Sequence, residues 1–413
     1  MRIRTDELVD RRAARGQRIL VTGGTGFLGS HIAVALLRAG HRVTLLVRPS
    51  RELPARARVD RLADWFGLEE GARRRLAVVE GDILDPAWAA AATAAGACES
   101  DEIVHCASNT SFAERKRAEV EAVNIGGLRN VLEFAARGRA VFFHHVSTAF
   151  VAGKRTGLCR EDWPDPGAAT NVYEETKARG EAMARDVCGR EGLRLNVLRP
   201  SIVYGDSRTG RSLRFNAVYF PVKAAVYLRD IYLADILDRG GRKAAALGVR
   251  LEGDGKMIMP LRIEAGDAGG INLVPIDFCV QALTAVIEDS LDGGIYHIVN
   301  PKPTKIGDIV GYAKRFFRLD GIEACVGAAF EARARTALET LYDSYLEPYR
   351  PYMQDFRTFE VKNAAASLKK RDLECPEFTY DVFARCMEYA VETDWGARLF
   401  PTPGTGGRKE GRS

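Results

Sequence analysis

The chain has 413 residues, 46% of them hydrophobic, so it is long enough to bury a large core in one α/β domain with an appended lobe or in two domains. Its 60 basic and 55 acidic side chains give a net charge of +5, and the arginines are scattered, which argues against a nucleic-acid-binding protein. No run of 18 apolar residues occurs, which argues against a membrane-spanning helix.

From the cysteines and the N-terminal segment we expect a cytoplasmic protein. The eight cysteines are far apart and form no C-x-x-C pair, which predicts reduced thiols and no metal site. Residues 1–17 contain acidic side chains and no apolar stretch, so we expect a short N-terminal extension and neither a secretory signal nor a transit peptide. Residues 401–413 have the composition of a disordered tail.

The first predicted element is a buried strand, residues 19–21, that runs into a glycine-rich turn and a helix over residues 30–37. In the turn, Gly23 permits a tight bend, Gly26 lets the backbone approach phosphate oxygens, and Gly29 lets the helix pack against the strand. An ordinary glycine-rich loop is the alternative, which the flanking strand and helix disfavour. The pattern therefore predicts a dinucleotide site, and its other cofactor-facing residues are Thr25, Phe27 and Leu28.

The residue that follows the second strand selects the cofactor. The strand covers residues 41–47, and Arg48 comes directly after it. An acidic residue there would bind the adenosine ribose of NAD, whereas a guanidinium suits the 2′-phosphate of NADP. Arg48 therefore favours NADPH over NAD. One of the next arginines is expected to make a second phosphate contact, with a solvated helix face as the alternative for each: Arg51, Arg58 and Arg61.

The third and fourth strands end in further candidate cofactor contacts. Residues 76–79 lead to Asp82 and Ile83, which we expect to bind the adenine amino group and the adenine ring; an N-cap is the alternative role for Asp82. Residues 103–107 form the fourth strand, and His105 inside it is expected to be structural. The end of this strand is expected to lie under the nicotinamide ribose and contains Cys106, Ala107 and Ser108.

The fifth strand leads to candidate catalytic residues. Residues 141–146 bring Thr148 to the carboxyl edge of the sheet, and a Y-x-x-x-K motif follows with Tyr173 and Lys177. Their spacing puts the two side chains on one helix face, one turn apart. An adjacent ammonium favours the phenolate, so Lys177 is expected to lower the pKa of Tyr173 toward the working range. Thr148 is expected to hydrogen-bond the substrate oxygen beside the phenol.

The sixth strand, residues 195–198, ends in a proline-containing segment. We expect the backbone after it to close over the carboxamide side of the nicotinamide, with simple strand termination by the proline as the alternative. The residues concerned are Pro200, Ser201 and Ile202.

Together these stretches resemble the extended short-chain dehydrogenase/reductase superfamily. The turn TGGTGFLGS, with its G-x-x-G-x-x-G spacing, and the motif YEETK carry that resemblance. Within this superfamily, the chain most resembles the NADPH-dependent acyl-thioester reductases, as the sequences LLVR, VSTAFV, RPSIV and VPIDF indicate. These enzymes are fatty acyl-CoA reductases and the terminal domain of carboxylic acid reductases, and they have a male-sterility-type NAD-binding domain. The resemblance covers residues 18–300. It implies an α/β fold, a doubly wound parallel Rossmann sheet with a smaller, mostly helical C-terminal substrate lobe.

The resulting domain assignment has an NADP-binding domain and a substrate lobe. The first comprises residues 18–205 with a return segment, residues 271–300, and the second residues 206–270 and 301–400. In the lobe, residues 215–237 are predicted to form a helical lid that is broken by Pro221. We expect the apolar face of this lid to pack in the core. An acyl-chain groove is the next alternative, followed by a dimer contact and a peripheral membrane contact. The aromatic residues between Leu341 and Phe359 are expected to form a cap over the substrate cleft.

The resemblance implies reduction of an acyl-CoA or acyl-carrier-protein thioester to an aldehyde, or onward to an alcohol. Thr148, Tyr173 and Lys177 carry over as the catalytic triad. A long helix is predicted from Glu119 and contains Asn124. The resemblance implies that Asn124 kinks this helix and holds a water near the lysine; a surface position is the alternative. Two competing interpretations keep an enzyme: a nucleotide-sugar epimerase or dehydratase, and a hydroxysteroid or flavonoid ketone reductase. A third is a non-catalytic NADP-sensing or scaffold protein, and the intact triad disfavours this third interpretation.

Overall fold

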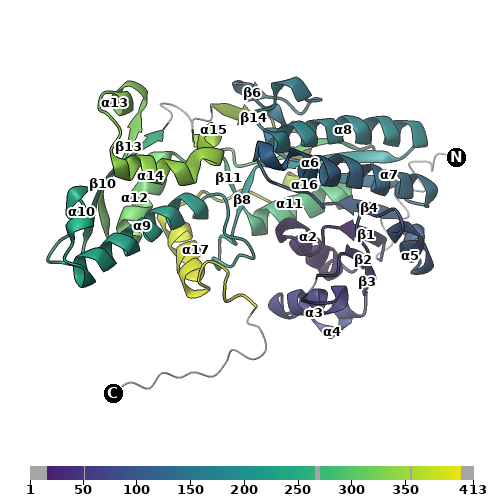
Figure 1. Cartoon of the computed structure of the whole chain (residues 1–413). Coiled ribbons are helices and arrows are strands. Elements are labelled where there is room, and N and C mark those ends of the chain that lie inside the picture. The colour runs from purple at the N-terminus through teal and green to yellow at the C-terminus, as the bar shows by residue number, and fades with distance from the viewer. Residues whose placement is uncertain (1–15, 51, 266–269, 354–355, 401–413) are drawn as a thin grey trace, which may run out of the picture.

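The structure is a computed structural model of the chain and describes residues 16–50, 52–265, 270–353 and 356–400 (Figure 1). The predicted tail of residues 401–413, and all but the last two residues of the predicted N-terminal extension, lie outside the described residues. Within the described ranges, no helix combines the length and hydropathy needed to span a bilayer. The same ranges contain no group of three or more acidic, histidine or cysteine side chains arranged to hold a metal ion.

A seven-stranded parallel sheet forms the centre of the larger half of the molecule. Its strands are, in spatial order, β12 (Gly294–Ile298), β7 (Arg194–Pro200), β5 (Phe142–Val146), β4 (Glu102–His105), β1 (Arg18–Thr22), β2 (Arg42–Val47) and β3 (Leu76–Glu80). The strand order reverses between β1 and β4, and ligands of such sheets bind at the carboxyl ends of the strands beside this reversal. The predicted doubly wound Rossmann sheet is confirmed.

Helices cover both faces of this sheet, so its inner strands β1, β4 and β5 are buried on both sides. On one face, buried side chains join β1 and β2 to α2 (Phe27–Arg38), α3 (Ala55–Trp65), α4 (Glu70–Arg73), α11 (Ile276–Asp289) and α16 (Lys362–Lys370). On the other face, a second apolar cluster includes α5 (Trp88–Ala94), α7 (Leu128–Arg137) and α8 (Val172–Glu191). α2 starts at Phe27, directly after the glycine turn and three residues before the predicted start of this helix.

The long helix predicted from Glu119 is interrupted at Asn124. α6 (Arg117–Glu121) continues through a π-helical turn, η3 (Ala122–Gly127), into α7. A π-helical turn widens the backbone spiral locally and is frequent at functional sites. Asn124 lies in this turn and is 4% exposed, so the alternative of a surface position is wrong.

The smaller half of the molecule surrounds its own apolar core and lies beside the sheet domain (Figure 1). Its helices are α9 (Tyr219–Asp238), α10 (Arg242–Ala246), α12 (Ile306–Phe317), α13 (Gly327–Glu331), α14 (Ala337–Leu346) and α17 (Tyr380–Glu392). The helices pack around a three-stranded sheet, of order β13 (Leu319–Val326), β10 (Met257–Ala265) and β9 (Arg250–Leu251). The sequence analysis did not predict this sheet, although β10 alternates buried and more exposed residues, as a half-buried strand does.

Pro221 does not break the lid helix, contrary to the sequence expectation. α9 begins at Tyr219, so Pro221 is the third residue of the helix. The backbone N–H groups of the first turn have no acceptor inside a helix, and a proline there removes no helical hydrogen bond.

Two small parallel strand pairs lie outside the central sheet. β8 (Ile202–Tyr204) pairs with β11 (Leu273–Pro275), and β6 (Gly157–Cys159) pairs with β14 (Arg357–Phe359). In the predicted return segment, therefore, only β12 joins the central sheet. The remaining short elements are η1 (Ala97–Glu99), η2 (Glu114–Lys116), η4 (Ala149–Ala152), η5 (Pro166–Ala168), η6 (Glu347–Tyr349) and α15 (Arg350–Met353).

Candidate active site

The turn between β1 and α2 depends on the absence of side chains. Gly23 has a φ of +71°, and a Cβ atom on it would lie 2.6 Å from the backbone nitrogen of Ala107. A Cβ on Gly29 would lie 2.3 Å from the carbonyl oxygen of Gly23, so α2 packs directly against the turn. A Cβ on Gly26 would meet only that same carbonyl oxygen within 4 Å, which leaves the outer side of the turn open. The turn therefore has the cradle that a pyrophosphate needs.

The start of α2 adds an electrostatic component to this cradle. The helix follows Gly26, whose position has no side-chain cap, and begins with Phe27 and Leu28. The backbone N–H groups of a first helical turn have no intrahelical acceptors and carry partial positive charge. Both features suit a phosphate group.

Two arginines come together beside the glycine turn. Arg58 of α3 donates a hydrogen bond to the carbonyl oxygen of Arg48 and another, of 3.2 Å, to Oγ1 of Thr25. Burial and the positive charge of Arg48 lower the pKa of Arg58. The two guanidinium groups are therefore close enough to repel each other, and an anion between them would relieve that repulsion.

The other two arginines of this segment have no described contact with the pair. Arg61, also on α3, makes no hydrogen bond or ion pair with the residues that the structure describes. Arg51 lies outside the described residues. Of the two predicted candidates that the structure describes, Arg58 and Arg61, only Arg58 contacts Arg48 and Thr25.

Asp82 and Ile83 lie on the far side of β2 from the glycine turn. Oδ1 of Asp82 accepts a 3.0 Å hydrogen bond from the backbone nitrogen of Leu84, and Oδ2 lies 3.7 Å from Nη1 of Arg48. The next helix, α5, begins only at Trp88, so the N-cap alternative for Asp82 is wrong. Ile83 is 8% exposed and packs against Gly127 of the π-helical turn. The adenine contacts of these two residues stay predictions.

The segment after β4 is joined to α8 through Asn124. Oδ1 of Asn124 accepts hydrogen bonds from Oγ of Ser108 (3.1 Å) and from the backbone nitrogen of Asn109 (2.8 Å). Its Nδ2 donates to the carbonyl oxygen of Asn109 and to Oγ1 of Thr176, 3.0 Å in each case. The π-helical turn thus places Asn124 between the strand end and the helix that carries Tyr173. The water-holding role of Asn124 stays a prediction.

Two other residues predicted at this strand end lie next to the turn and the lysine. The backbone nitrogen of Cys106 donates a 3.2 Å hydrogen bond to the carbonyl oxygen of Thr22, and Ala107 is the residue against which Gly23 packs. Burial raises the pKa of the Cys106 thiol to about 11, although the charge of Lys177 opposes the shift. The thiol is therefore neutral at pH 7.

The three candidate catalytic side chains meet at the carboxyl end of β5. Thr148 follows this strand, is 5% exposed, and its hydroxyl lies close enough to Tyr173 to favour the ionised phenol. Tyr173 is the second residue of α8, and Lys177 lies one turn further on. Nζ of Lys177 donates a 2.8 Å hydrogen bond to the carbonyl oxygen of Val146, the last residue of β5. The helix and the strand are therefore tied together at the residues that the motif singled out.

Burial dominates the titration of this group. It lowers the pKa of Lys177 to about 8, although Cys106 and the buried Glu181 favour the ammonium. It also raises the pKa of the Tyr173 phenol, and the nearby hydroxyl of Thr148 only partly offsets this shift. The sequence analysis expected Lys177 to lower the pKa of Tyr173; in the structure the shift has the opposite sign because the phenol lies in a poorly solvated position.

The residues after β7 have mainly structural partners. Pro200 ends β7 and is buried, and Oγ of Ser201 lies 2.6 Å from Oδ1 of Asn272. Ile202 starts the short strand β8 and is half-buried. The hydroxyl of Ser201 is thus engaged within the protein, and the predicted nicotinamide contact of this segment depends on its backbone. His105, as predicted, is structural: it is 1% exposed and its Nδ1 lies 2.9 Å from Oγ1 of Thr22.

The sequence analysis expected an aromatic cap between Leu341 and Phe359, but it did not identify Phe112 and Phe150, which the cap contacts beside the candidate triad. The ring of Phe112 lies 5.8 Å from that of Tyr173 and 5.4 Å from that of Tyr352. Tyr352 also contacts Phe150, at 5.0 Å, and Tyr349 contacts Phe112, at 5.9 Å. We refer to Phe112, Phe150, Tyr349 and Tyr352 as the aromatic cluster. The abundance of aromatic residues between positions 341 and 359 was the one signal of a contact with this region.

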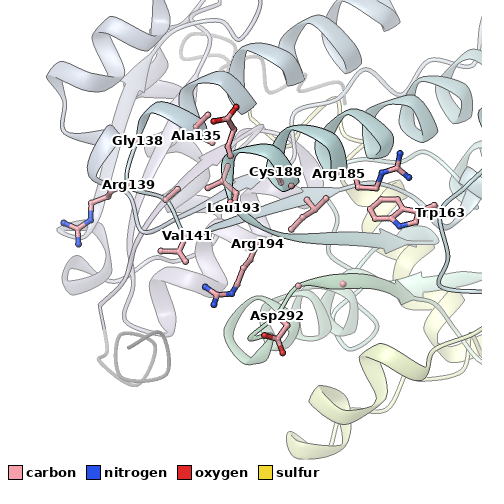
Figure 2. Close-up of a pocket in the computed structure, with 18 residues that line it drawn as sticks. Ala135, Gly138, Arg139, Val141, Trp163, Arg185, Cys188, Leu193, Arg194 and Asp292 are labelled. Carbon is pink, nitrogen blue, oxygen red and sulfur yellow. The ribbon is translucent and has the colours of Figure 1, made fainter. Parts of the chain in front are cut away.

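Two cavities lie on the described surface near α8, at opposite ends of the helix. One, of about 410 Å³, lies at the start of α8, where Asn171, Val172 and Glu175 line it beside Tyr173. The other, of about 660 Å³, lies where β5, β7 and β12 begin, at the opposite edge of the sheet from the triad. Figure 2 shows that its arginines, Arg139, Arg185 and Arg194, point in different directions. Neither lining includes Thr148, Tyr173 or Lys177, although the first includes Val172, the residue before Tyr173.

Comparison with protein families gives one match that covers most of the chain. The model of an NAD-binding family described as "Male sterility protein" matches residues 21–283. This range includes the glycine turn, both arginines beside it and the three candidate catalytic residues. It ends within α11, before the segment that contributes Tyr349 and Tyr352.

The curated relatives are distant, and each match covers only part of the relative. The chain is 23% identical over 401 residues to a linear gramicidin synthase protein of Brevibacillus parabrevis, an alignment that covers 91% of this chain and 7% of that protein. It is 29% identical over 197 residues to a 3 beta-hydroxysteroid dehydrogenase/Delta 5-->4-isomerase of Mycobacterium tuberculosis, which covers 46% of this chain and 48% of the relative. The chain thus spans less than half the length of these relatives.

Solved structures share the fold. The terminal R domain from the myxalamid PKS-NRPS pathway superposes with a TM-score of 0.71 at 23% identity, with 92% of each chain covered. A thiolation-reductase di-domain from an archaeal non-ribosomal peptide synthetase gives 0.68 at 15% identity, with 94% of this chain and 78% of that one covered. UDP-glucuronic acid 4-epimerase of Bacillus cereus, in complex with NAD, gives 0.58 at 18% identity, with 92% and 98% covered.

Proposed function

Because the chain belongs to the NAD-binding male sterility protein family, within the extended short-chain dehydrogenase/reductase superfamily, we propose that it is an NADPH-dependent reductase of acyl thioesters. Its product is an aldehyde, or an alcohol if the aldehyde is reduced again. The observation that carries the proposal is the meeting of Thr148, Tyr173 and Lys177 at one strand end, next to an open glycine turn.

The three side chains supply what reduction of a thioester carbonyl requires. Bound NADPH supplies the hydride for the carbonyl carbon. The hydroxyls of Thr148 and Tyr173 hydrogen-bond the carbonyl oxygen and stabilise the negative charge that develops on it. Tyr173 then donates a proton to this oxygen. Lys177 binds the nicotinamide ribose and holds positive charge near the phenol. The resulting thiohemiacetal releases the thiol and leaves the aldehyde.

The preference for NADPH over NADH rests on the pair of arginines. Arg48 and Arg58 would hold the 2′-phosphate, with Thr25 beside it. Guanidinium groups bind phosphate through paired, charge-assisted hydrogen bonds, and the repulsion between the two arginines falls when a dianion lies between them. The rest of the dinucleotide would lie on the glycine turn and under the ends of β4 and β7.

The thioester is proposed to arrive on a carrier protein or on coenzyme A. A carrier is favoured because the structural relatives include a thiolation-reductase di-domain and a terminal R domain of a synthetase pathway. In this assignment residues 206–270 and 301–400 form the substrate-binding lobe. In the aromatic cluster, Tyr349 and Tyr352 of that lobe contact Phe112, which in turn contacts Tyr173, and we propose that the cluster contacts the acyl group.

A second candidate keeps the fold and changes the substrate. The hydroxysteroid dehydrogenase match and the likeness to an NAD-bound epimerase favour a ketone reductase or a nucleotide-sugar epimerase. Such enzymes use the same hydroxyl pair on a ketone or sugar, so the substrate lobe decides between the two candidates.

The experiment is NADPH oxidation at fixed protein concentration, with the products identified by mass spectrometry. The panel contains acyl-CoAs, acyl groups on a purified carrier protein, free aldehydes, steroid ketones and UDP-sugars. Oxidation with thioesters and release of free thiol would support the proposal. Turnover of ketones alone, or conversion of a UDP-sugar without net NADPH consumption, would move the assignment to the second candidate.

A further inference from the structure

The segment that supplies Tyr349 and Tyr352 is held to the start of α8 by a buried hydrogen-bond group. The hydroxyl of Tyr352 donates a 2.7 Å hydrogen bond to Oε1 of Glu174 and accepts one of 2.8 Å from Nδ2 of Asn171. Glu174 is fully buried, and Tyr352 is 5% exposed. These bonds join positions that are 178 and 181 residues apart in the chain.

The Glu174 carboxylate is matched by hydrogen-bond donors on both of its oxygens. Its Oε2 accepts hydrogen bonds from the backbone nitrogen (2.8 Å) and the hydroxyl (2.6 Å) of Thr170. A carboxylate that is buried without such partners is strongly destabilising. If the hydroxyl of Tyr352 were removed, Oε1 would lose the partner that comes from the C-terminal segment, and the start of α8 would lose its connection to that segment.

Both partners of Tyr352 adjoin the candidate catalytic tyrosine. Asn171 caps α8 by accepting a 3.0 Å hydrogen bond from the backbone nitrogen of Glu174, and Tyr173 lies between them in the sequence. A change in the position of Glu174 or Asn171 therefore moves the turn of helix that carries the phenol.

The ring of Tyr352 also reaches the candidate threonine. It packs against Phe150, whose backbone nitrogen donates a 3.3 Å hydrogen bond to Oγ1 of Thr148. On its other side it contacts Phe112, which touches Tyr173. A second attachment lies just beyond: Nη1 of Arg357 donates a 2.8 Å hydrogen bond to the carbonyl oxygen of Gly153. Tyr352 thus bridges the two hydroxyl-bearing positions from the C-terminal side.

We propose that Tyr352 is a positioning residue, which through its hydrogen bond to Glu174 sets the relative placement of Tyr173 and Thr148. This inference rests on the proposed function, because it presumes that these two hydroxyls act on the substrate carbonyl. It adds a residue from outside the matched family region, since the family match ends at residue 283. The C-terminal segment is then part of the machinery for the chemical step as well as a wall for the substrate.

The test compares Tyr352→Phe, which removes only the hydroxyl, with Tyr345→Phe as the matched control. Tyr345 lies on α14 of the same segment, and its ring contacts Tyr227 of α9, away from the aromatic cluster. For Tyr352→Phe we expect kcat to fall about tenfold, while the Kd for NADPH changes less than twofold and the Tm stays within a few degrees. Glu174→Gln, which keeps an acceptor for the Tyr352 hydroxyl, should retain more activity than Glu174→Ala.

The outcomes separate the inference from the proposed function. An unchanged kcat in Tyr352→Phe overturns the inference, and so does an equal loss in Tyr345→Phe. A large fall in Tm together with loss of NADPH binding also overturns it, since the hydroxyl would then support the fold alone. Failure of the wild-type protein to reduce any thioester overturns the proposed function instead. In that case kcat for whichever ketone or aldehyde it does reduce, together with hydrogen exchange of the amides of residues 170–177, still tests Tyr352.

Discussion

Nζ of Lys177 lies 2.8 Å from the carbonyl oxygen of Val146, so the ammonium group of α8 is bound to the last residue of β5. Both groups are buried, and this burial lowers the pKa of Lys177 to about 8. The lysine is the group of the candidate triad that changes charge near neutral pH, because burial raises the pKa of Tyr173 well above that range.

The first prediction concerns the pH dependence of activity. Since a lowered lysine pKa means that the ammonium is present below about pH 8 and lost above it, kcat/KM should fall as the pH rises through about 8. The measurement is kcat/KM for the reduced substrate between pH 6 and 10. In Lys177→Arg, whose guanidinium stays charged throughout, residual activity should show no such fall. A profile of the wild-type protein that is flat to pH 10 would contradict the assignment.

The second prediction concerns the phenol itself. Tyr173→Phe should bind NADPH as the wild-type protein does, but lose about 10²- to 10⁴-fold in kcat, because proton donation to the carbonyl oxygen is removed. Cofactor affinity is measured by the fluorescence of bound NADPH, and turnover by its oxidation. Tyr312→Phe is a suitable control, because this tyrosine packs against Phe378 and Phe383 in the other half of the molecule. Equal turnover in Tyr173→Phe and the wild-type protein would remove Tyr173 from the mechanism.

The third prediction concerns cofactor choice. Hydrogen bonds to charged groups contribute about 1.5–3 kcal/mol each, so Arg58→Ala should weaken NADPH binding roughly 10- to 100-fold and leave NADH binding nearly unchanged. Arg48→Ala should act in the same direction. Arg61→Ala provides the control, since Arg61 lies on the same helix and makes no hydrogen bond with described residues. Equal losses for NADPH and NADH in Arg58→Ala would show that Arg58 does not bind the 2′-phosphate.

The parts of the site that local sequence patterns predicted are those built from neighbouring residues. The bend at Gly23 and the one-turn spacing of Tyr173 and Lys177 depend on only a few consecutive positions. The doubly wound parallel sheet is likewise consistent with the alternation of strands and helices along the chain. The cofactor and substrate roles of these residues remain predictions.

What the sequence did not predict depends on contacts between distant positions. β10 and β13 pair along most of their length although about 60 residues separate them, and neither has a local signal strong enough to identify a partner. The bond between Tyr352 and Glu174 is of the same kind. The sign of the pKa shift of Tyr173 was also wrong in the sequence analysis, because the burial that raises this pKa is a property of the folded protein.

The fourth prediction concerns the glycine turn. In Gly29→Ala the new Cβ would lie 2.3 Å from the carbonyl oxygen of Gly23, so α2 must move away from the turn. Overpacking of this kind costs about 1–3 kcal/mol of stability, and NADPH binding should fall at least tenfold because the phosphate cradle is displaced. Gly189→Ala is the matched control: Gly189 lies in α8 with nothing within 4 Å of its Cβ position, and alanine there should stabilise the helix by about 0.5–1 kcal/mol. Normal NADPH binding by Gly29→Ala would argue against a pyrophosphate on this turn.

The last prediction concerns the stability of the smaller half of the molecule at low pH. The carboxylate of Glu339 in α14 accepts a 2.7 Å hydrogen bond from Nε of Arg262 in β10 and one of 2.8 Å from the backbone nitrogen of Thr336, the N-cap of that helix. The pKa of Glu339 is lowered from its usual 4.5 to about 2. The main cause is the side-chain hydrogen bond from Arg262, and the bond from the backbone nitrogen of Thr336 adds to it. A carboxyl group with a lowered pKa in the folded state stabilises the protein above its unfolded pKa, and this contribution is lost as the pH falls from about 4.5 toward 2. The full size of this contribution is about 3 kcal/mol, since each pKa unit corresponds to about 1.4 kcal/mol.

Glu339→Gln should therefore lower the urea midpoint at pH 7, and its difference from the wild-type protein should shrink below about pH 4.5. Glu331→Gln, at an exposed position of α13, should match the wild-type protein at every pH. If the difference between Glu339→Gln and the wild-type protein stayed constant from pH 7 to pH 3, the ion pair with Arg262 would not be its source, because only a titrating carboxylate makes the difference depend on pH.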